Sequence, residues 1–528
     1  MKKITLTLLS FILTFSMFAG GLVTNTNQSA AWTRMLNRNA TVEIDAVFFN
    51  PAALTKLEDG FHLSISNQII GQTKSITNSA LGNKTFEGDV FAPVYPSISA
   101  AYKTGKLAFS FGFYPVGGGG SAEFNDGVPS IEMGIASLPT ALAALGATGG
   151  FSYNTYLEGS SVYFGIQGGI SYEINDMISV FAGARYVMAK NTYSGYIRDI
   201  TLQTADPNAP LTNASVTAMA DYAQAAADGV GQIVDGGGGD LTLEQAEQAQ
   251  LIDAATRAQL EAGLVQMGLD PATMPLSGVE SAYATAATNM YTAAGVLADQ
   301  ELDAEQTGSG ITPIIGVNLS LMEDRLNIGL KYEFKTAMTL TNATTKDIVV
   351  GVDPTTGQPI TMFPDGAESN ADIPALLSGG VSFKVNDALR IEADFESYFD
   401  KSVGWKRSDP FTGAEITADD FIDKGYLLYG FGLEYNISDA LLISAGWSGT
   451  QTGVNDKYHS DLSYSLNTNT FGGGLAYKIN DMIKLNLGGY YVMYTDKTIQ
   501  YPVSTTEYYT QTYDTKLWGV GIGLDFSF

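Results

Sequence analysis

The sequence contains no cysteine and only two histidines, His62 and His459, among 528 residues. Without cysteine the chain can form no disulfide and offers no thiolate to a metal ion. The two histidines are far apart in the sequence, whereas a histidine-based metal site needs several ligands in one place. We therefore expect neither a metal centre nor a cofactor.

Basic residues are scarce as well. The chain has 28 Lys and Arg against 55 Asp and Glu, which gives a formal net charge of −27. Proteins that bind nucleic acid neutralise phosphates with clustered Lys and Arg. This charge balance excludes nucleic acid as an expected partner.

Long hydrophobic runs are missing after the first twenty residues. Residues 4–18 form a largely apolar run behind Lys2 and Lys3, and Ala19 precedes two glycines. This pattern predicts a secretory signal peptide over residues 1–19, cleaved after Ala19, with an uncleaved anchor as the alternative. No later stretch offers about 18 consecutive apolar residues, so no membrane-spanning helix is expected.

Alternation takes the place of long runs. Hydrophobic residues make up 45% of the chain, yet the mean hydropathy is only +0.04. Residues 517–528 show why, because every second position is large and apolar: Trp518, Val520, Ile522, Leu524, Phe526 and Phe528. A period of two indicates a strand with one apolar face, and the length suits the roughly 9–11 residues that cross a bilayer at a tilt. We interpret this stretch as the closing strand of an outer-membrane β-barrel.

The same alternation recurs along the chain and predicts fourteen strands. Their approximate cores are residues 61–72, 94–103, 106–116, 157–174, 177–196, 311–322, 325–342, 373–385, 388–402, 424–436, 439–450, 463–479, 482–499 and 506–528. An even number of strands places both ends of the barrel on the periplasmic side. The expected fold is all-β, a 14-stranded antiparallel transmembrane β-barrel formed by residues 61–528.

A short motif repeats where hairpin turns are expected. Residues 172–176, 383–387 and 477–481 each read aromatic, polar, aliphatic, Asn, Asp, and residues 435–439 are a close variant. Asn and Asp tolerate the left-handed backbone that tight turns require. These turns all follow even-numbered strands, so we expect short periplasmic turns with an aromatic girdle beside them.

The non-lipid faces of the predicted strands carry charge. In residues 389–396 the apolar positions alternate with Arg390, Glu392, Asp394 and Glu396. Such charges require partners if they are buried. A polar barrel interior, where they pair with one another and with a plug, accommodates them; a purely structural role for the charges is the simpler interpretation.

The segment before the first strand, residues 20–60, lacks the strand pattern. Within it, Asn50 precedes Pro51, Ala52, Ala53 and Leu54, which predicts a short helix that begins at Pro51 and is capped by Asn50. We expect this segment, called the hatch below, to lie inside the barrel. A short surface turn is the alternative.

Residues 204–308 form an insertion of another kind. They hold fifteen acidic residues and one basic residue, Arg257, and are rich in alanine. A capping box at Thr242 starts a predicted helix that runs to about Met267, and a second helix is expected over residues 279–304. We interpret the insertion as a helical extracellular loop; a calcium site near Asp235 and Asp240 is a weaker alternative because its spacing fits no hand-type loop.

The hatch motif resembles that of the FadL family of outer-membrane transporters for long-chain fatty acids and other hydrophobic compounds. The resemblance is carried by residues 20–22, by residues 45–54 with Asn50, Pro51, Ala52 and Leu54, and by the fourteen strands that follow. It implies a plugged barrel that takes up a hydrophobic ligand in the bacterial outer membrane, in contact with outer-membrane lipid. In the family the hatch shifts to release the ligand.

The resemblance also implies a lateral opening in the third strand. Pro115 with Gly117 and Gly118 would interrupt that strand, because proline donates no ladder hydrogen bond and glycine bends easily. An apolar patch on the next loop is the candidate for an external ligand groove: Met133, Ile135, Leu138, Leu142 and Leu145. The alternative for this patch is a small helix packed on the barrel rim.

Three other functions remain open from the sequence. A general porin would lack a plug, and an adhesin would use the acidic insertion to bind a partner. A lipid hydrolase would need a nucleophile with a histidine base, and neither histidine is placed in such a set, so we expect no enzyme. We expect a monomer that transports an oily small molecule.

Overall fold

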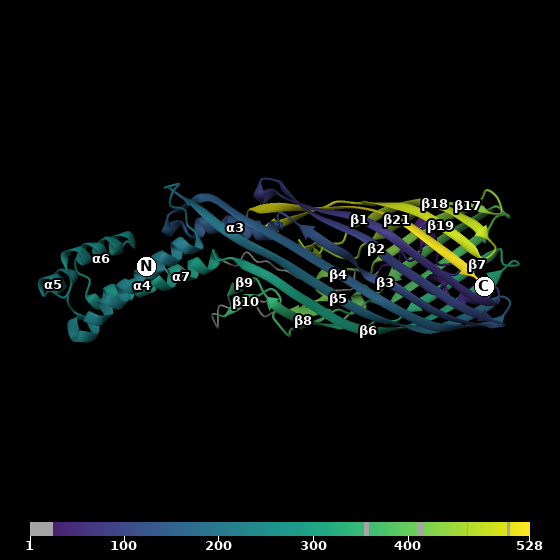
Figure 1. Cartoon of the computed structure of the whole chain (residues 1–528), viewed down its shortest axis with the longest axis horizontal. Coiled ribbons are helices and arrows are strands. Elements are labelled where there is room, and N and C mark those ends of the chain that lie inside the picture. Colours follow the sequence, from purple (N-terminus) through teal and green to yellow (C-terminus); the bar gives the residue numbers. More distant parts are fainter. Residues whose placement is uncertain (1–24, 353–357, 409–414, 462, 504–506) are drawn as a thin grey trace. The chain divides into compact units, whose positions relative to one another are not determined.

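The computed structural model describes residues 25–352, 358–408, 415–461, 463–503 and 507–528 (Figure 1). The predicted signal peptide, residues 1–19, and residues 20–24 of the hatch lie outside the described part. The chain divides into two compact units, which are described separately: residues 134–155 and 196–300 form one, and the described residues outside these ranges form the other.

The larger unit is a closed, 14-stranded antiparallel β-barrel over the described residues, which confirms the predicted fold. Its strands are β1 (Gly60–Asn78), β2 (Lys84–Thr104), β3 (Leu107–Phe124), β4 (Ala147–Asn175), β5 (Ile178–Thr204), β6 (Gln300–Leu321), β7 (Leu326–Glu333), β12 (Leu376–Lys384), β13 (Leu389–Tyr398), β16 (Leu427–Asn436), β17 (Leu441–Gln451), β18 (Thr468–Asn480), β19 (Ile483–Tyr494) and β21 (Tyr508–Ser527). The ends of β4 and β5 extend into the smaller unit. The barrel closes where β1 pairs antiparallel with β21, from His62↔Ser527 to Asn78↔Gln511.

The alternating pattern separates the two faces of the wall. On β21, Trp518, Val520 and Ile522 point outward and are 44%, 51% and 53% exposed. The inward positions between these three residues are glycine, and Gly521 faces Thr33 of the hatch. The outside of the barrel is therefore an apolar surface, as a wall in contact with lipid requires.

The repeated turn motif closes hairpins at the end of the barrel where β1 begins and β21 ends. The side-chain oxygens of Asn175 and Asn386 each accept two backbone N–H groups within their turns, and that of Asn480 accepts one. Tyr172 and Tyr477, beside these turns, are 47% and 46% exposed. Asparagine thus stabilises the turn while the neighbouring tyrosine forms part of an outward aromatic girdle.

Several predicted strand bounds were wrong at the opposite end of the barrel. The seventh predicted strand, 325–342, ends at Glu333, and residues 339–346 form a separate strand, β8 (Thr339–Lys346), that pairs with β6 and with β11 (Glu368–Asn370). The carboxylate of Asp372 accepts the N–H of Met338 (3.1 Å) and pairs with Lys335, so this chain segment leaves the ladder. The fourteenth predicted strand, 506–528, corresponds to β21. The thirteenth, 482–499, is divided into β19 and a separate strand, β20 (Lys497–Pro502).

The loops at this end carry further short elements. They are α3 (Pro129–Ala141), β9 (Val349–Val352), β10 (Pro359–Thr361), β14 (Lys406–Ser408), β15 (Glu415–Thr417), α8 (Ala418–Phe421) and the 3-10 turns η2 (Ser79–Leu81), η3 (Ala143–Leu145), η5 (Asp400–Ser402) and η6 (Asp456–Tyr458). One loop is tied down by Asp461, which accepts the N–H of Ser130 (2.7 Å) and a side-chain N–H of Gln511. Burial raises the pKa of the Asp461 carboxyl.

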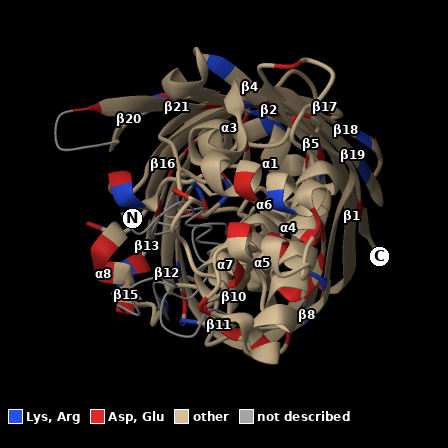
Figure 2. Cartoon of the chain, turned by 90° about the vertical axis from the view of Figure 1, so that its left-hand side faces the viewer, with Lys and Arg blue, Asp and Glu red and all other residues tan. Residues whose placement is uncertain are grey.

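Besides most of α3, the smaller unit contains four α-helices among its described residues: α4 (Asn213–Ile233), α5 (Leu243–Gln248), α6 (Ala254–Gln266) and α7 (Leu276–Val296). Its core includes Leu260, Leu264, Val279 and Tyr283. Acidic residues recur along these helices (Figure 2). Within the described residues, no helix has the length and the apolar character that crossing a membrane would need.

The helix predictions for residues 204–308 need correction. Thr242 does form a capping box with Gln245, but the predicted run to Met267 breaks at residues 249–253, where Asp253 caps α6 by accepting the N–H of Thr256 (2.7 Å). The predicted second helix, 279–304, ends at Val296, because β6 already begins at residue 300. Helix α4 was not predicted, since its alanine- and glycine-rich sequence has few large apolar residues at helical spacing.

Candidate functional site

Helices of the hatch lie inside the barrel. The described part of the hatch, residues 25–59, contains α1 (Ala30–Met35), α2 (Ala46–Phe49) and the 3-10 helix η1 (Pro51–Lys56). Almost every hatch residue from Gln28 to Thr55 is buried. The hatch therefore fills the section of the barrel that it crosses.

A row of glycines lets the hatch backbone approach the wall. A Cβ on Gly446 of β17 would lie 2.6 Å from the carbonyl carbon of Met35, and one on Gly488 of β19 would lie 2.5 Å from the backbone nitrogen of Arg34. Further glycines of the wall face backbone or side-chain atoms of the hatch: Gly329, Gly380, Gly430, Gly432, Gly472, Gly474, Gly521 and Gly523. Only glycine leaves room for this contact, so the wall is shaped to the hatch.

Buried charge also joins the hatch to the wall. Arg34 and Arg38 are 0% and 1% exposed. Arg38 donates to Asp45 from two nitrogens (2.9 and 2.8 Å) within the hatch, while Arg34 pairs with Glu434 of β16. Because a buried charge is costly without a partner, these pairs favour a single seated position of the hatch.

The acidic residues of β13 bind hatch backbone. Asp394 accepts the N–H of Asn39 (2.8 Å), and Glu392 accepts the N–H of Ala40 (2.8 Å). Two of the charged residues predicted to face the interior, Glu392 and Asp394, therefore have a structural role, because they hold the hatch backbone. This agrees with the simpler interpretation of the sequence.

The hatch motif lies against β4, β5 and β6. Pro51 begins η1 as predicted, but the side chain of Asn50 makes no capping hydrogen bond. Instead it donates to the side-chain oxygen of Asn318 on β6 (2.8 Å), which corrects the predicted capping role. The carbonyl of Ala52 accepts from Ser179 (2.7 Å), and Leu54 is fully buried. The motif anchors one end of the hatch to the wall.

Phe48 occupies a polar part of the interior that the sequence did not reveal. Lys331 donates to the carbonyl of Phe48 (2.7 Å) and lies 4.7 Å from its ring centroid, while Arg185 lies 5.1 Å from the same centroid. Glu333 pairs with both cations at 2.7 Å. No periodic signal could have joined these residues, because they come from two strands, β5 and β7, and from the hatch.

The wall itself has a gap between β2 and β3. The two strands pair from Thr104↔Leu107 to Ile98↔Phe113 and again at Val90↔Ala122, but not between. We call this break the β2–β3 gap; it comprises residues 91–97 of β2 and 114–121 of β3. All three residues of the predicted opening lie within it. Strand β3 itself continues to Phe124 and stays paired with β4, so Pro115, Gly117 and Gly118 interrupt the ladder and not the strand.

Hatch residues supply hydrogen-bond donors to this gap. Asn25 donates its N–H to the carbonyl of Val116 (2.9 Å) and its side-chain N–H to that of Gly118 (2.8 Å). The carbonyl of Pro115 accepts from the side chains of Gln28 (2.9 Å) and Tyr95 (2.8 Å). Donors that β2 would supply in a complete ladder therefore come mainly from the hatch.

The interior beside the gap has little free space. A cavity of about 20 Å³ is lined by hatch residues, by Val116 of β3 and by Arg185 among others, which is room for about one water molecule.

The five residues of the predicted external groove lie on α3 and the turn after it. Ile135 and Leu138 are buried at 5% and 6% exposure, and Met133, which accepts a hydrogen bond at its sulfur from Asn78 (3.2 Å), is half-buried. Leu142 and Leu145 are half-buried around η3. Such burial is expected of a packed helix, so the groove stays a prediction.

Both histidines have structural partners. His62 contacts the hydroxyl of Ser527 (3.0 Å) and the carbonyl of Glu58 (2.9 Å), and His459 contacts the carbonyls of Asn455 (3.2 Å) and Ser465 (3.1 Å). Within the described residues, no group of three or more His, Asp or Glu is arranged to hold a metal ion.

Comparison with known proteins relates this arrangement to solved structures. No protein-family model and no curated protein matches the chain. A FadL homologue of Pseudomonas aeruginosa aligns with a TM-score of 0.56 and 13% identity, covering 96% of this chain and 100% of that one. The Pseudomonas putida toluene transporter TodX aligns at 0.51 and 13% identity, over 96% and 100% of the two chains. A deltaS2S3 mutant of TodX, a monoaromatic hydrocarbon channel, aligns at 0.54 and 12% identity, over 95% and 99%. The chain therefore has a FadL-like fold, a 14-stranded barrel with helices inside it.

Proposed function

We propose that this protein is a FadL-type channel of the bacterial outer membrane that takes up hydrophobic compounds. In this proposal the signal peptide is removed, the short turns face the periplasm, and the helical insertion of residues 204–308 is extracellular. The channel acts as a monomer surrounded by outer-membrane lipid and catalyses no reaction.

The observation that carries the proposal is the β2–β3 gap filled by hatch donors. A gap in a lipid-facing wall leaves backbone groups without ladder partners, which is costly in hydrocarbon. Here Asn25 and Gln28 satisfy these groups from inside. A hatch that withdraws from the gap would open a sideways route from the interior to the bilayer.

A sideways route suits an oily ligand for a physical reason. Apolar surface is driven out of water, so a compound released through the wall passes directly into hydrocarbon without crossing an aqueous compartment. Phe91 and Val94, on the part of β2 that is not paired with β3, are 64% and 69% exposed and would provide an apolar exit. Pro115, Gly117 and Gly118 are the proposed frame of this exit.

The solved structures with this fold support the class of ligand. One is called a FadL homologue and another a toluene transporter. We infer that the ligand is a hydrophobic small molecule, either a long-chain fatty acid or a smaller hydrocarbon. The apolar patch that contains Met133, Leu142 and Leu145 is the proposed first contact, provided that α3 shifts to expose it.

The seated hatch argues against a general porin. Arg34 and Arg38 form buried ion pairs in the barrel interior, and the cavity beside Phe48 has room for about one water molecule. Such a barrel would conduct ions poorly until the hatch moves. No comparable contact favours the adhesin alternative.

Uptake by intact cells tests the proposal. Cells that lack endogenous uptake channels of this type are supplied with the full-length gene or an empty vector and exposed to radiolabelled oleate, toluene or a small sugar. We expect the protein to increase the initial uptake rate of oleate, toluene or both severalfold, and to leave that of the sugar unchanged.

The outcomes separate the candidate functions. Equal rates of oleate and toluene uptake with and without the protein would contradict transport of hydrophobic compounds. A faster entry of the sugar alone would identify a porin instead. Surface labelling of the insertion confirms that the protein has reached the outer membrane in every comparison.

A further inference from the structure

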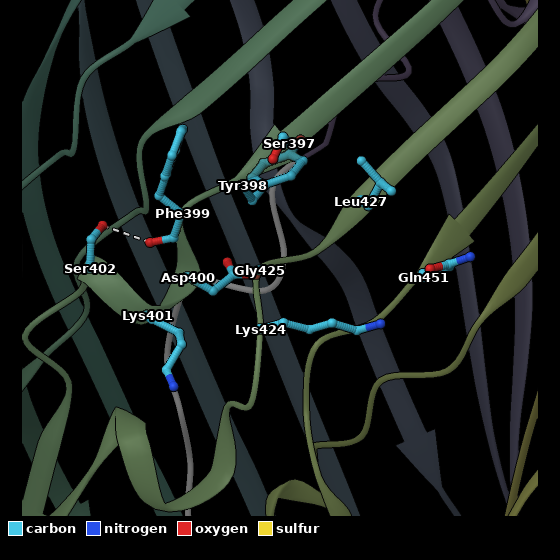
Figure 3. Close-up of a pocket in the computed structure, with 10 residues that line it drawn as sticks. All are labelled: Ser397, Tyr398, Phe399, Asp400, Lys401, Ser402, Lys424, Gly425, Leu427 and Gln451. Atoms are coloured by element: carbon cyan, nitrogen blue, oxygen red, sulfur yellow. Dashed lines mark hydrogen bonds between the residues drawn. The ribbon is translucent and has the colours of Figure 1, made fainter.

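A second site lies on the outer face of the barrel wall, away from the hatch. A cavity of about 630 Å³ is formed where β13, β16 and β17 meet their loops (Figure 3). Glu392, Asp394 and Glu396 of β13 point inward and are buried, so the alternate residues Phe395, Ser397 and Phe399 point outward. The cavity therefore opens on the side of the wall that faces lipid.

Aromatic side chains place this cavity at the edge of the apolar band. Phe399 and Tyr429 are 42% and 37% exposed on the outward face. Phe399 packs edge-on against Tyr332 (6.1 Å between centroids), and Tyr429 against Trp447 (5.7 Å). Outward aromatic residues gather where the hydrocarbon core gives way to headgroups. The cavity thus lies at headgroup level, at the end of the barrel opposite the short turns.

Two exposed lysines line the cavity. In Figure 3 the side chain of Lys424 extends toward Gln451, and no partner for its ammonium is found among the described residues. Lys401 pairs with Asp419 at 3.5 Å, but both side chains are well exposed, 48% and 79%, and such a pair is weak. Both ammonium groups are therefore available to an anion.

The carboxylate of Asp400 also lines the cavity, and its negative charge offsets part of the positive charge of the two lysines. Asp400 is 1% exposed and accepts the N–H of Tyr426 at 2.6 Å. Burial raises the pKa of Asp400 to about 6, so this carboxyl is ionised at pH 7.5. Two lysines still leave the lining with a net positive charge, in a chain whose net charge is −27.

We propose that this cavity binds the phosphate-bearing headgroup of a membrane lipid, with its acyl chains lying along the outward aromatic wall. Lys401 and Lys424 hold the phosphate, while Phe399 and Leu427 contact the first carbons of the chains. The volume falls within the range of small-molecule sites, which suits a headgroup. The site depends on the proposed membrane location and is independent of transport.

Lipid binding to the purified, detergent-solubilised protein at pH 7.5 tests this site. Native mass spectrometry measures the fraction carrying dioleoylphosphatidic acid, or dioleoylglycerol, which has the same chains without phosphate. The test variant is Lys401→Gln with Lys424→Gln. The control is Lys516→Gln, which removes an exposed lysine from an outward position of β21, outside the cavity.

We expect the wild type and Lys516→Gln to bind the lipid phosphate at least about tenfold more tightly than the double variant, because the two ammonium groups attract the anionic headgroup. Dioleoylglycerol should bind the wild type no better than it binds the double variant. Equal binding of phosphatidic acid to all three proteins would overturn the site.

A competition experiment distinguishes the source of the phosphate. Millimolar inorganic phosphate should leave the bound phosphatidic acid in place, because the acyl chains supply part of the affinity. Complete displacement would show that the cavity takes free phosphate and would refute the lipid assignment. Unchanged oleate and toluene uptake in the double variant would show that the site is separate from the transport route.

Discussion

Single glycines determine how closely the hatch seats against the wall. Gly446 on β17 and Gly488 on β19 face the hatch backbone. A flexible side chain could change its rotamer to make room for an added Cβ, but the backbone cannot. Packing at interior density leaves no space for one more methyl group at such a position. The fit of the hatch therefore depends on the absence of side chains as much as on buried ion pairs.

Gly446→Ala should unseat the hatch, because its Cβ would lie 2.6 Å from the carbonyl carbon of Met35. Overpacking of this kind costs about 1–3 kcal/mol. We expect faster tryptic cleavage after Arg34 or Arg38, which are 0% and 1% exposed in the seated hatch. Cleavage is followed by mass spectrometry of the folded protein in detergent.

Gly489→Ala is the matched control for this substitution. Its Cβ would lie 3.4 Å from the carbonyl of Gly519 and 3.8 Å from Val520, which are ordinary contacts. Protection of Arg34 and Arg38 should match the wild type. If both variants are cleaved at the same rate as the wild type, the glycine contacts do not control hatch seating.

At the scale of elements, the hatch and the strands differ in how far the sequence predicts them. Lipid on one side and hatch on the other impose the same alternation on each strand, so residues 517–528 already indicated the wall. Pro115 lacks an N–H, and with Gly117 and Gly118 it marked where the β2–β3 ladder breaks. The partners of Pro115 could not be predicted, because Gln28 and Tyr95 are distant in the sequence and approach its carbonyl only in the folded chain.

The failures have physical causes too. Strand 325–342 stops early because the carboxylate of Asp372 takes the N–H of Met338 in place of a ladder partner. Asn50 looked like a cap because it precedes Pro51, but its side chain finds Asn318 instead. In both cases a long-range polar contact replaced the local interaction that the sequence predicted.

If the hatch moves during transport, helix α1 must separate from the barrel wall. A disulfide between Thr33→Cys and Gly521→Cys tests this, since a Cβ on Gly521 would lie 3.2 Å from that of Thr33, a few tenths of an ångström short of the usual disulfide spacing of about 3.5–4.5 Å. The chain has no other cysteine. We expect the oxidised double variant to lose most of its oleate or toluene uptake and to regain it with a reductant.

Two further samples complete this test. Thr33→Cys alone should transport like the wild type under both redox conditions. A double variant that is fully cross-linked, as judged by mass spectrometry, and that still transports at the reduced rate would show that α1 stays on the wall while ligand passes.

At the scale of the whole barrel unit, the proposed function couples closure of the wall to passage of the ligand. The wall is continuously paired along β1 and β21, whereas the ladder between β2 and β3 is interrupted at the β2–β3 gap. The hatch completes this place from inside through Asn25 and Gln28. The same residues that keep lipid out of the barrel would, on moving, let an oily ligand leave it.

Uptake after the β2–β3 gap is filled tests this account most directly. Ala92 lies across the gap from Gly120, at 3.6 Å from a Cβ placed there, so Ala92→Trp should obstruct it. Ala393→Trp is the control, because Ala393 is exposed on β13, where the ladder to both neighbours is complete. The account predicts that Ala92→Trp lowers oleate or toluene uptake to a small fraction of the wild-type rate and that Ala393→Trp leaves it unchanged. Equal, undiminished uptake by both variants would contradict it.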